Sequence, residues 1–374
     1  MKKRRSIEIR KGDKFRFKQL GQIMQSIDTL LQATIDRKAS DLHIISDYFP
    51  SVRINSELVP LKTLEMVTAI DAQTMLFNIL TEEQKQNLLA NKEIDFGYEY
   101  KGNRFRANIY YAKNRLAGAF RFIPAEIRKL EELKLPNSLY DFTRFEQGLV
   151  LMTGPTGEGK STTLATMIND INMRDAKHIV TIEDPIEFVY PTGRSIISQR
   201  ELHQDTHSWT VALRSVLRED PDVVLIGEMR DLDTIQAAIT VAETGHLVFA
   251  TLHTSSTPEA VNRMIDVFPS GQQNQIRNQL ASVLKVIITQ RLVPTIDKKS
   301  RIPALEVLVN IPAVAAIIRE GKLFLLDNVL ETEEKQGMIL FEKYLYKLYQ
   351  QGVISKEDAI QHAVRTSEIK KFII

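Results

Sequence analysis

Eight residues near the middle of the chain constrain its fold more than any other segment. Residues 154–161 read Gly154-Pro155-Thr156-Gly157-Glu158-Gly159-Lys160-Ser161. They fit G-x-x-x-x-G-K-[ST], the loop whose backbone N–H groups wrap around nucleotide phosphates. Glycines let the backbone turn tightly and approach the phosphates closely. We therefore predict that Lys160 reaches the β- and γ-phosphates and that the Ser161 hydroxyl ligates Mg²⁺.

The segments on either side of this loop are the ones it requires. Residues 149–153 form an apolar run that predicts a buried strand. Residues 161–172 predict a helix, whose N-terminal dipole would point at the bound anion. A glycine-rich turn without a ligand would not account for a lysine at the start of a helix. We expect a nucleotide site here, with Thr162 also near the phosphates.

Composition limits the remaining possibilities. A chain of 374 residues is long enough for two or three domains. The formal charge of +2 comes from 49 basic and 47 acidic residues, which argues against a nucleic-acid partner. The absence of cysteine excludes disulfides and cysteine-ligated zinc. No apolar run approaches 18 residues and no signal-peptide core is visible, so we expect a cytoplasmic protein.

The first 18 residues are the one biased segment. They carry nine Lys or Arg residues against Glu8 and Asp13. One interpretation is a solvated, partly disordered tail. The alternative is a peripheral contact with anionic lipid or an acidic partner.

Two domains with different patterns follow this tail. Residues 19–123 predict a small α+β domain, and residues 124–137, charged and bounded by prolines, predict a linker. In the first domain we expect helices at about 20–37 and from a capping box at 81–84, and strands at 41–45, 51–54, 94–100, 104–111 and 116–122.

From about residue 138 strands and helices alternate, which predicts an α/β domain with a mostly parallel sheet covered by helices. After about residue 270 the pattern favours helices to the end of the chain. The predicted strands are 149–153, 178–182, 223–226 and 247–252, and the predicted helices are 161–172, 208–218, 231–243 and one opening at 355–358.

Acidic residues and histidines lie at the ends of three predicted strands. Glu183 and Asp184 follow strand 178–182, and Glu228 follows strand 223–226. Open α/β sheets bind ligands at the carboxyl ends of their strands. We predict that Glu228 orients the attacking water or accepts its proton, with Glu183 as the second candidate for that role. Glu183 and Asp184 would hold Mg²⁺, partly through water.

Histidines bracket the fourth strand, with His246 before it and His253 after it. We expect them to sense the γ-phosphate or to contact a neighbouring subunit, and the alternative is packed neutral histidines. His203 and His207 have a zinc-like i, i+4 spacing, but without a cysteine or a third ligand packing or surface roles are favoured. Trp209 is interpreted as a core residue.

The order of these clusters closely resembles the secretion-ATPase superfamily of type II secretion and type IV pili, and most closely its pilus-retraction members. The resemblance runs from about residue 20 to the end. The matching segments, besides the 154–161 loop, are 39–43 (ASDLH), 104–106 (RFR), 120–124 (FRFIP), 181–188 (TIEDPIEF), 217–222 (LREDPD), 227–231 (GEMRD), 243–254 (ETGHLVFATLHT), 290–294 (QRLVP) and 317–322 (IIREGK).

The resemblance implies a PAS-like N-terminal domain, a RecA-like ATPase domain, ATP and Mg²⁺ as cofactors, and a homohexameric ring. It implies that Arg104, Arg106 and Arg121 approach a nucleotide across a domain or subunit interface. It also implies a motor that depolymerises a type IV pilus by acting on an inner-membrane platform protein, at the cytoplasmic face of that membrane.

Alternatives to retraction are pilus or pseudopilus assembly, a regulatory ATP-binding module and, least favoured, a nucleic-acid translocase. The assembly members carry a four-cysteine zinc insert, which this sequence lacks, and segment 317–322 resembles a retraction-type motif. Position 158 is Glu where the family usually has Ser. We expect that carboxylate to point to solvent, because a negative charge aimed at phosphates would weaken binding.

Overall fold

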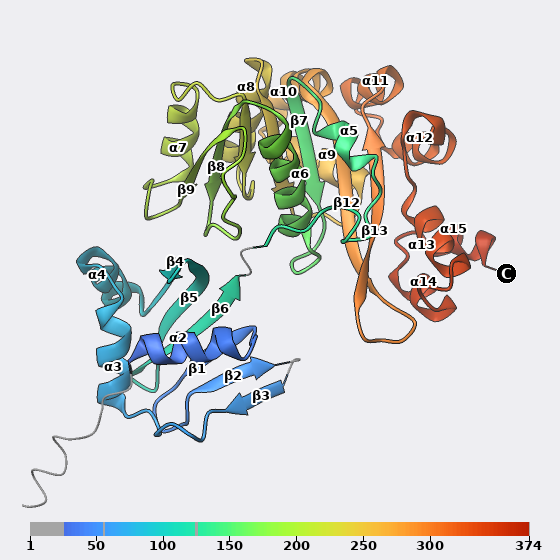
Figure 1. Ribbon diagram of the computed structural model, residues 1–374. Coiled ribbons are helices and arrows are strands. Elements are labelled where there is room, and N and C mark those ends of the chain that lie inside the picture. The colour runs from blue at the N-terminus through green and yellow to red at the C-terminus, as the bar shows by residue number, and fades with distance from the viewer. Residues whose placement is uncertain (1–25, 55–56, 124–125, 374) are drawn as a thin grey trace, which may run out of the picture. The chain divides into compact units, whose positions relative to one another are not determined.

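The computed structural model describes residues 26–54, 57–123 and 126–373. The basic segment at 1–18 and its expected roles lie outside these residues. The chain divides into two compact units, one ending at Ile123 and the other beginning at Pro124. Figure 1 shows the elements of each unit. Within the described residues no helix is both long and apolar enough to cross a membrane.

The first unit is an α+β domain built on a six-stranded antiparallel sheet of order β3-β2-β1-β6-β5-β4. The predicted capping box at Thr81 is confirmed, since Thr81 accepts from the Gln84 N–H and the Gln84 side chain accepts from the Thr81 N–H. The elements are α2 (Ile27–Asp36), β1 (Asp41–Ile44), β2 (Ser51–Ile54), β3 (Glu57–Pro60), α3 (Ala69–Asn78), α4 (Glu82–Asn91), β4 (Glu93–Tyr100), β5 (Asn103–Ala112) and β6 (Arg115–Ile123).

The second unit contains a seven-stranded sheet of order β13-β12-β7-β11-β10-β8-β9. Six strands are parallel, and β13 pairs antiparallel with β12. The strands are β7 (Gly148–Thr153), β8 (His178–Glu183), β9 (Ile196–Glu201), β10 (Val223–Ile226), β11 (Leu247–Leu252), β12 (Leu284–Pro294) and β13 (Arg301–Val309).

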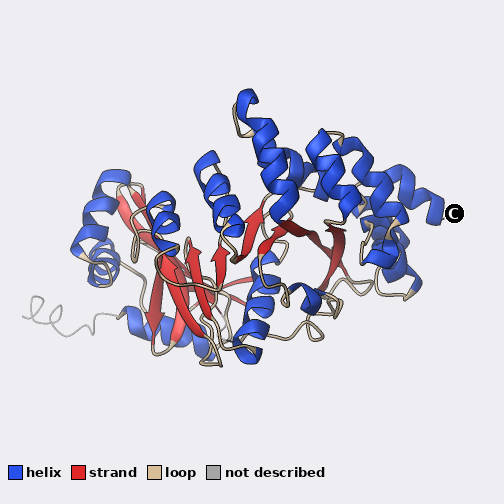
Figure 2. Cartoon of the chain, turned by 90° about the horizontal axis from the view of Figure 1, so that it is seen from above, coloured by secondary structure: helices blue, strands red, loops and turns tan. Residues whose placement is uncertain are grey.

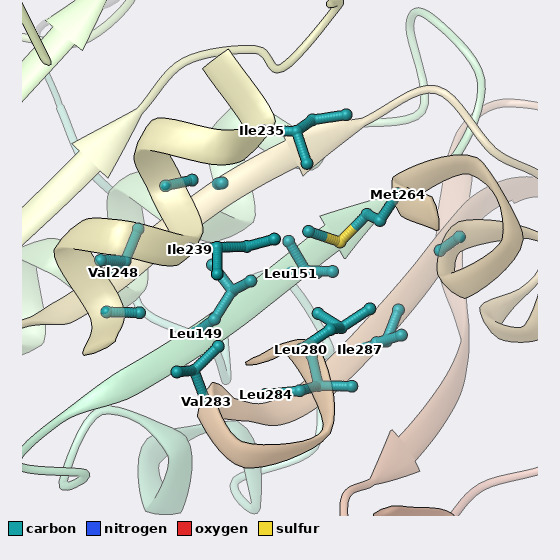
Figure 3. Packing of buried hydrophobic residues seen from close by; sticks show 14 of the residues in the cluster. Leu149, Leu151, Ile235, Ile239, Val248, Met264, Leu280, Val283, Leu284 and Ile287 are labelled. Carbon is teal, nitrogen blue, oxygen red and sulfur yellow. The ribbon is translucent and has the colours of Figure 1, made fainter. Parts of the chain in front are cut away.

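Helices cover both faces of this sheet. Successive residues of β7 point to opposite faces, so they pack against different helices. Leu149 and Leu151 pack against helices α7 to α10, and Figure 3 shows Ile239 and Leu280 of that layer beside them. Val150 and Met152 pack on the other side against α5 and α6. These helices are α5 (Leu139–Phe142), α6 (Lys160–Arg174), α7 (Trp209–Val216), α8 (Leu232–Glu243), α9 (Thr257–Asp266) and α10 (Ser270–Val283).

The prediction of helices throughout the chain after residue 270 is wrong at β12 and β13. Most residues of both strands are buried. A strand buried on both faces shows no alternation of apolar and polar residues, and so it resembles a buried helix in sequence. In addition, α10 ends at Val283 and β12 begins at Leu284 without any turn residue between them.

The C-terminal segment is helical, as Figure 2 shows near the end of the chain. Ser355 caps its helix as predicted, accepting from the Asp358 N–H. Residues 126–137, expected to be a linker, belong to the second unit, and Leu130 and Leu135 are buried in its core. The C-terminal helices are α11 (Pro312–Glu320), α12 (Leu326–Thr332), α13 (Phe341–Gln350), α14 (Lys356–His362) and α15 (Thr366–Phe372).

A buried charge cluster joins these helices to the sheet. The Arg365 guanidinium contacts Glu306 of β13 at 2.7 Å and Glu342 of α13 at 3.2 Å. Both carboxylate side chains are at most 1% exposed. Glu306 also accepts from the Thr257 N–H and hydroxyl at the start of α9. Arg365 therefore supplies the positive charge that two buried carboxylates need.

We predict that Arg365→Met destabilises the protein by about 3–5 kcal/mol, because it leaves buried charges without their partner. Urea unfolding of the full chain would measure this loss. Lys343→Met is the matched control, since it removes the exposed pair with Glu334 and should change stability by less than about 1 kcal/mol. Equal effects of the two substitutions would contradict the role given to Arg365.

Candidate nucleotide site

The phosphate loop, residues 154–161, connects the fully buried strand β7 to helix α6. Gly154, Gly157 and Gly159 have φ angles of +136°, +83° and +78°. Residues that carry a Cβ atom rarely adopt these positive φ angles, which explains why the loop has glycine at all three positions. A Cβ atom at Gly154 would also lie 2.3 Å from the carbonyl oxygen of Gln290. The loop thus has the backbone shape that its sequence pattern requires.

The N-cap position of α6 offers only backbone groups to an anion. Gly159 is the N-cap residue and has no side chain to cap the helix. The N–H groups of the first turn, which includes Ser161 and Thr162, therefore have no N-cap side chain to donate to. Such N–H groups and the helix dipole favour a phosphate at this position. The geometry fits the predicted nucleotide.

Lys160 lies folded against the loop. Its Nζ donates to the carbonyl oxygens of Gly154 and Pro155 at 2.6 and 2.8 Å. Burial lowers the pKa of this ammonium group, and the carboxylates of Glu228 and Glu158 act in the opposite direction. The charge is held at the loop, in reach of a phosphate that can replace the two carbonyl acceptors.

Glu228 follows Gly227 at the carboxyl end of β10, as predicted. Its Oε2 accepts from Arg230 Nη2 at 2.7 Å, and its Oε1 lies 3.0 Å from His253 Nε2. Burial alone would raise the pKa of Glu228, but the contacts with Arg230 and His253 lower it below its usual value. The carboxylate is therefore ionised at neutral pH, the form that a general base needs.

His253 connects this carboxylate to the phosphate loop. Its Nδ1 lies 3.2 Å from Thr156 Oγ1, and its Nε2 contacts Glu228. The imidazole lies at the carboxyl end of β11, next to the end of β7. The structure thus brings together three predicted site residues from three separate segments.

Glu183 and Asp184 occupy different environments at the end of β8. Glu183 is buried and accepts from Thr181 Oγ1 at 2.7 Å and from Gln199 Nε2 at 3.3 Å. Burial raises the pKa of Glu183 to about 7, although these hydrogen bonds oppose it. Asp184 is exposed. The exposed Asp184 carboxylate and the half-buried Ser161 hydroxyl suit a Mg²⁺ ion that keeps much of its water better than the buried Glu183 does.

The interpretation of His246 as a sensor of this chain's own γ-phosphate is wrong. His246 precedes β11, at the end opposite to His253, and its Nδ1 lies 3.1 Å from the Val241 carbonyl oxygen of α8. The two histidines flank the strand Leu247–Leu252, so seven steps at roughly 3.3 Å per residue separate them by about 23 Å. Both bracket one strand in sequence, but only the carboxyl end meets the phosphate loop. A contact with a neighbouring subunit stays a prediction.

The expectation that Glu158 points to solvent is also wrong. Its carboxylate accepts a hydrogen bond from the Leu292 N–H of β12, and the residue is half-buried. Sequence reasoning could not find this contact, since 134 positions separate the two residues.

The three predicted arginines lie on one face of the first unit's sheet. Arg104 and Arg106 are two residues apart on β5 and so share a face of the sheet, and Arg121 of β6 is directly opposite Arg106. Arg106 Nε donates to Asp95 at 3.0 Å, and Arg121 Nε donates to Asp41 at 3.0 Å. These side chains are 40% and 70% exposed. The structure gathers them on one surface of a unit other than that of the phosphate loop.

Two further residues of the site received no role from the sequence. Arg230 holds Glu228, and the Gln290 side chain contacts the phosphate loop and α6. Both lie in segments of the family resemblance, which was the only signal for them. Trp209 packs against the core as expected. Among the described residues, no three His, Asp or Glu side chains are grouped as a metal site.

Comparisons with known proteins agree with this geometry. The type II/IV secretion system protein family matches residues 128–370. The twitching motility protein of Neisseria gonorrhoeae is 42% identical, over 94% of this chain and 93% of that protein. The type IV pilus retractation ATPase PilT of Pseudomonas aeruginosa is 40% identical, over 90% and 98%. A crystal structure of the pilus retraction motor PilT with bound ADP is 41% identical, with a TM-score of 0.87, over 93% and 99%.

Fold and site together define a RecA-like P-loop ATPase with an α+β N-terminal domain, which confirms the predicted fold class. The chain belongs to the type II/IV secretion system protein family. The resemblance inferred from the ordered motifs is confirmed.

The raised pKa of Glu183 predicts a pH-dependent stability. The folded protein holds this proton up to about pH 7, whereas the unfolded chain releases it near pH 4.5, so stability falls as pH rises between these values. Glu183→Gln removes the titration. Its unfolding midpoint relative to the wild type should therefore rise between pH 5 and pH 8. Parallel pH profiles of the two proteins would contradict the assignment.

Proposed function

We propose that this chain is an ATPase motor that retracts a type IV pilus. The observation that carries the proposal is the chain of contacts from Thr156 through His253 to Glu228. It places an ionised carboxylate beside a loop shaped for phosphates. The relatives described above, which match this chain over more than 90% of their own length and are named for twitching and pilus retraction, support the direction of the motor.

Each residue of the site has a task in ATP hydrolysis. The N–H groups of the phosphate loop cradle the phosphates, and Lys160 exchanges its two carbonyl acceptors for phosphate oxygens. Ser161 and Asp184 would hold Mg²⁺, which neutralises phosphate charge. Glu228 orients water and accepts its proton, while Arg230 and His253 hold the carboxylate in place.

The motor would be a homohexameric ring that acts on an inner-membrane platform protein of the pilus. The ring and the platform protein come from the family resemblance. Two features of the sequence favour retraction over assembly: the chain has no cysteine for a zinc insert, and segment 317–322 resembles the retraction-type motif.

Glu228→Gln should bind ATP normally but hydrolyse it about 10²–10⁴-fold more slowly, because the amide cannot accept the proton. The measurements are steady-state phosphate release and equilibrium binding of ATP with Mg²⁺. Unchanged turnover would move the base elsewhere, with Glu183 the next candidate. Negligible turnover in the wild type would instead favour the regulatory ATP-binding module.

We further propose that Arg104, Arg106 or Arg121 completes the active site of another subunit. A guanidinium offers a planar fork of donors that suits phosphate oxygens. Arg106 forms an exposed pair with Asp95, whereas the exposed Arg121 pairs with the largely buried Asp41. Because exposed ion pairs are weak, Arg106 can exchange its carboxylate for a phosphate.

Mixed rings test this proposal. Lys160→Ala subunits and subunits with all three arginines changed to alanine should each be inactive alone. Combined, they should recover part of the ATPase activity, since some interfaces then join an intact phosphate loop to intact arginines. Verified mixed rings without any recovery would contradict a contact between subunits.

A further inference from the structure

The Glu158 carboxylate contacts a part of β12 that extends beyond its neighbouring strand. β7 ends at Thr153, which is in register with Thr289, whereas β12 continues to Pro294. Leu292 lies on the part of β12 that β7 does not reach, and its N–H donates to the Glu158 carboxylate.

A second contact fixes the same loop residue through its main chain. Gln290 Nε2 donates to the Glu158 carbonyl oxygen at 2.7 Å. Its Oε1 accepts from Thr163 Oγ1 of α6 at 2.8 Å. β12 thus holds the loop at residue 158 by side chain and by backbone.

The residues beside Glu158 make such anchoring necessary. Gly157 and Gly159 both have positive φ, and a Cβ at Gly157 would meet open space. Glycine loses more backbone freedom than any other residue when it is ordered. A loop already held in its bound shape does not have to lose that freedom when the phosphates arrive.

We propose that Glu158 is a positioning residue that pre-forms the phosphate loop through its hydrogen bond to the Leu292 N–H. The proposal rests on the nucleotide binding proposed above. Its carboxylate accepts a hydrogen bond from the Leu292 N–H near the end of β12. This hydrogen bond offsets the negative charge of Glu158 that would otherwise repel a phosphate. Glu158 contributes geometry to the site and touches no reacting atom.

Two substitutions separate geometry from charge. Glu158→Gln keeps an acceptor oxygen and removes the charge, whereas Glu158→Ala removes both. We expect the dissociation constant of ADP with Mg²⁺ to stay within about twofold for the glutamine variant. For the alanine variant it should rise about 3–10-fold, the loss of one hydrogen bond. The KM for ATP should rise with it, while kcat at saturation stays near the wild-type value.

Glu187→Gln is the matched control for charge, because Glu187 and Glu158 both act on Lys160 through their charges. If Glu158 acted by repulsion, its glutamine and alanine variants would both bind ADP more tightly than the wild type, and Glu187→Gln would follow them. That result overturns the proposal. Equal dissociation constants for wild type, Glu158→Gln and Glu158→Ala overturn it as well.

Hydrogen exchange provides a readout independent of nucleotide. Amides in the peptide that contains Leu292 should exchange faster in Glu158→Ala than in the wild type, and at the wild-type rate in Glu158→Gln. An unchanged rate in the alanine variant would contradict the hydrogen bond itself. A wild-type protein that binds no ADP would refute the proposed function separately, whatever the exchange rates.

Discussion

The pairing of β7 with β11 on one side and β12 on the other is the constraint on which the site depends. β7 is buried along its whole length, so its position is fixed by packing on both faces. Because β7, β10 and β11 are parallel, their carboxyl ends share one edge of the sheet. That edge receives the phosphate loop, Glu228 and His253. A change that shifted β7 would move all three parts of the site together.

The electrostatic environments of Glu228 and Glu183 at this edge of the sheet differ, and so do their pKa values. Glu228 lies between a guanidinium and an imidazole, and these contacts lower its pKa. Glu183, one strand away, has no cation among the groups that shift its pKa, and burial raises it to about 7. The same residue type is therefore ionised at one position and half protonated near neutral pH at the other. This difference favours Glu228 as the base.

The sequence was sufficient where one local segment carries the signal. The strands before the phosphate loop and before Glu228 were predicted correctly, because an apolar run that ends in a polar residue is visible without knowledge of strand pairing. Contacts between distant segments were not predictable: the contact of Glu158 with Leu292 joins residues 134 positions apart and depends on how the chain folds. His246 shows the same limit, because the direction of a strand decides which of its flanking residues meets the ligand.

The central claim is that ATP hydrolysis at Glu228 drives retraction, and the number of surface pili tests it most directly. Pili would be counted by electron microscopy on cells lacking this protein, on cells complemented with the wild type and on cells complemented with Glu228→Gln. A retraction motor predicts more pili than in the wild type, together with loss of twitching, both in the deletion and with Glu228→Gln. Cells without pili in either strain would contradict retraction and indicate an assembly motor.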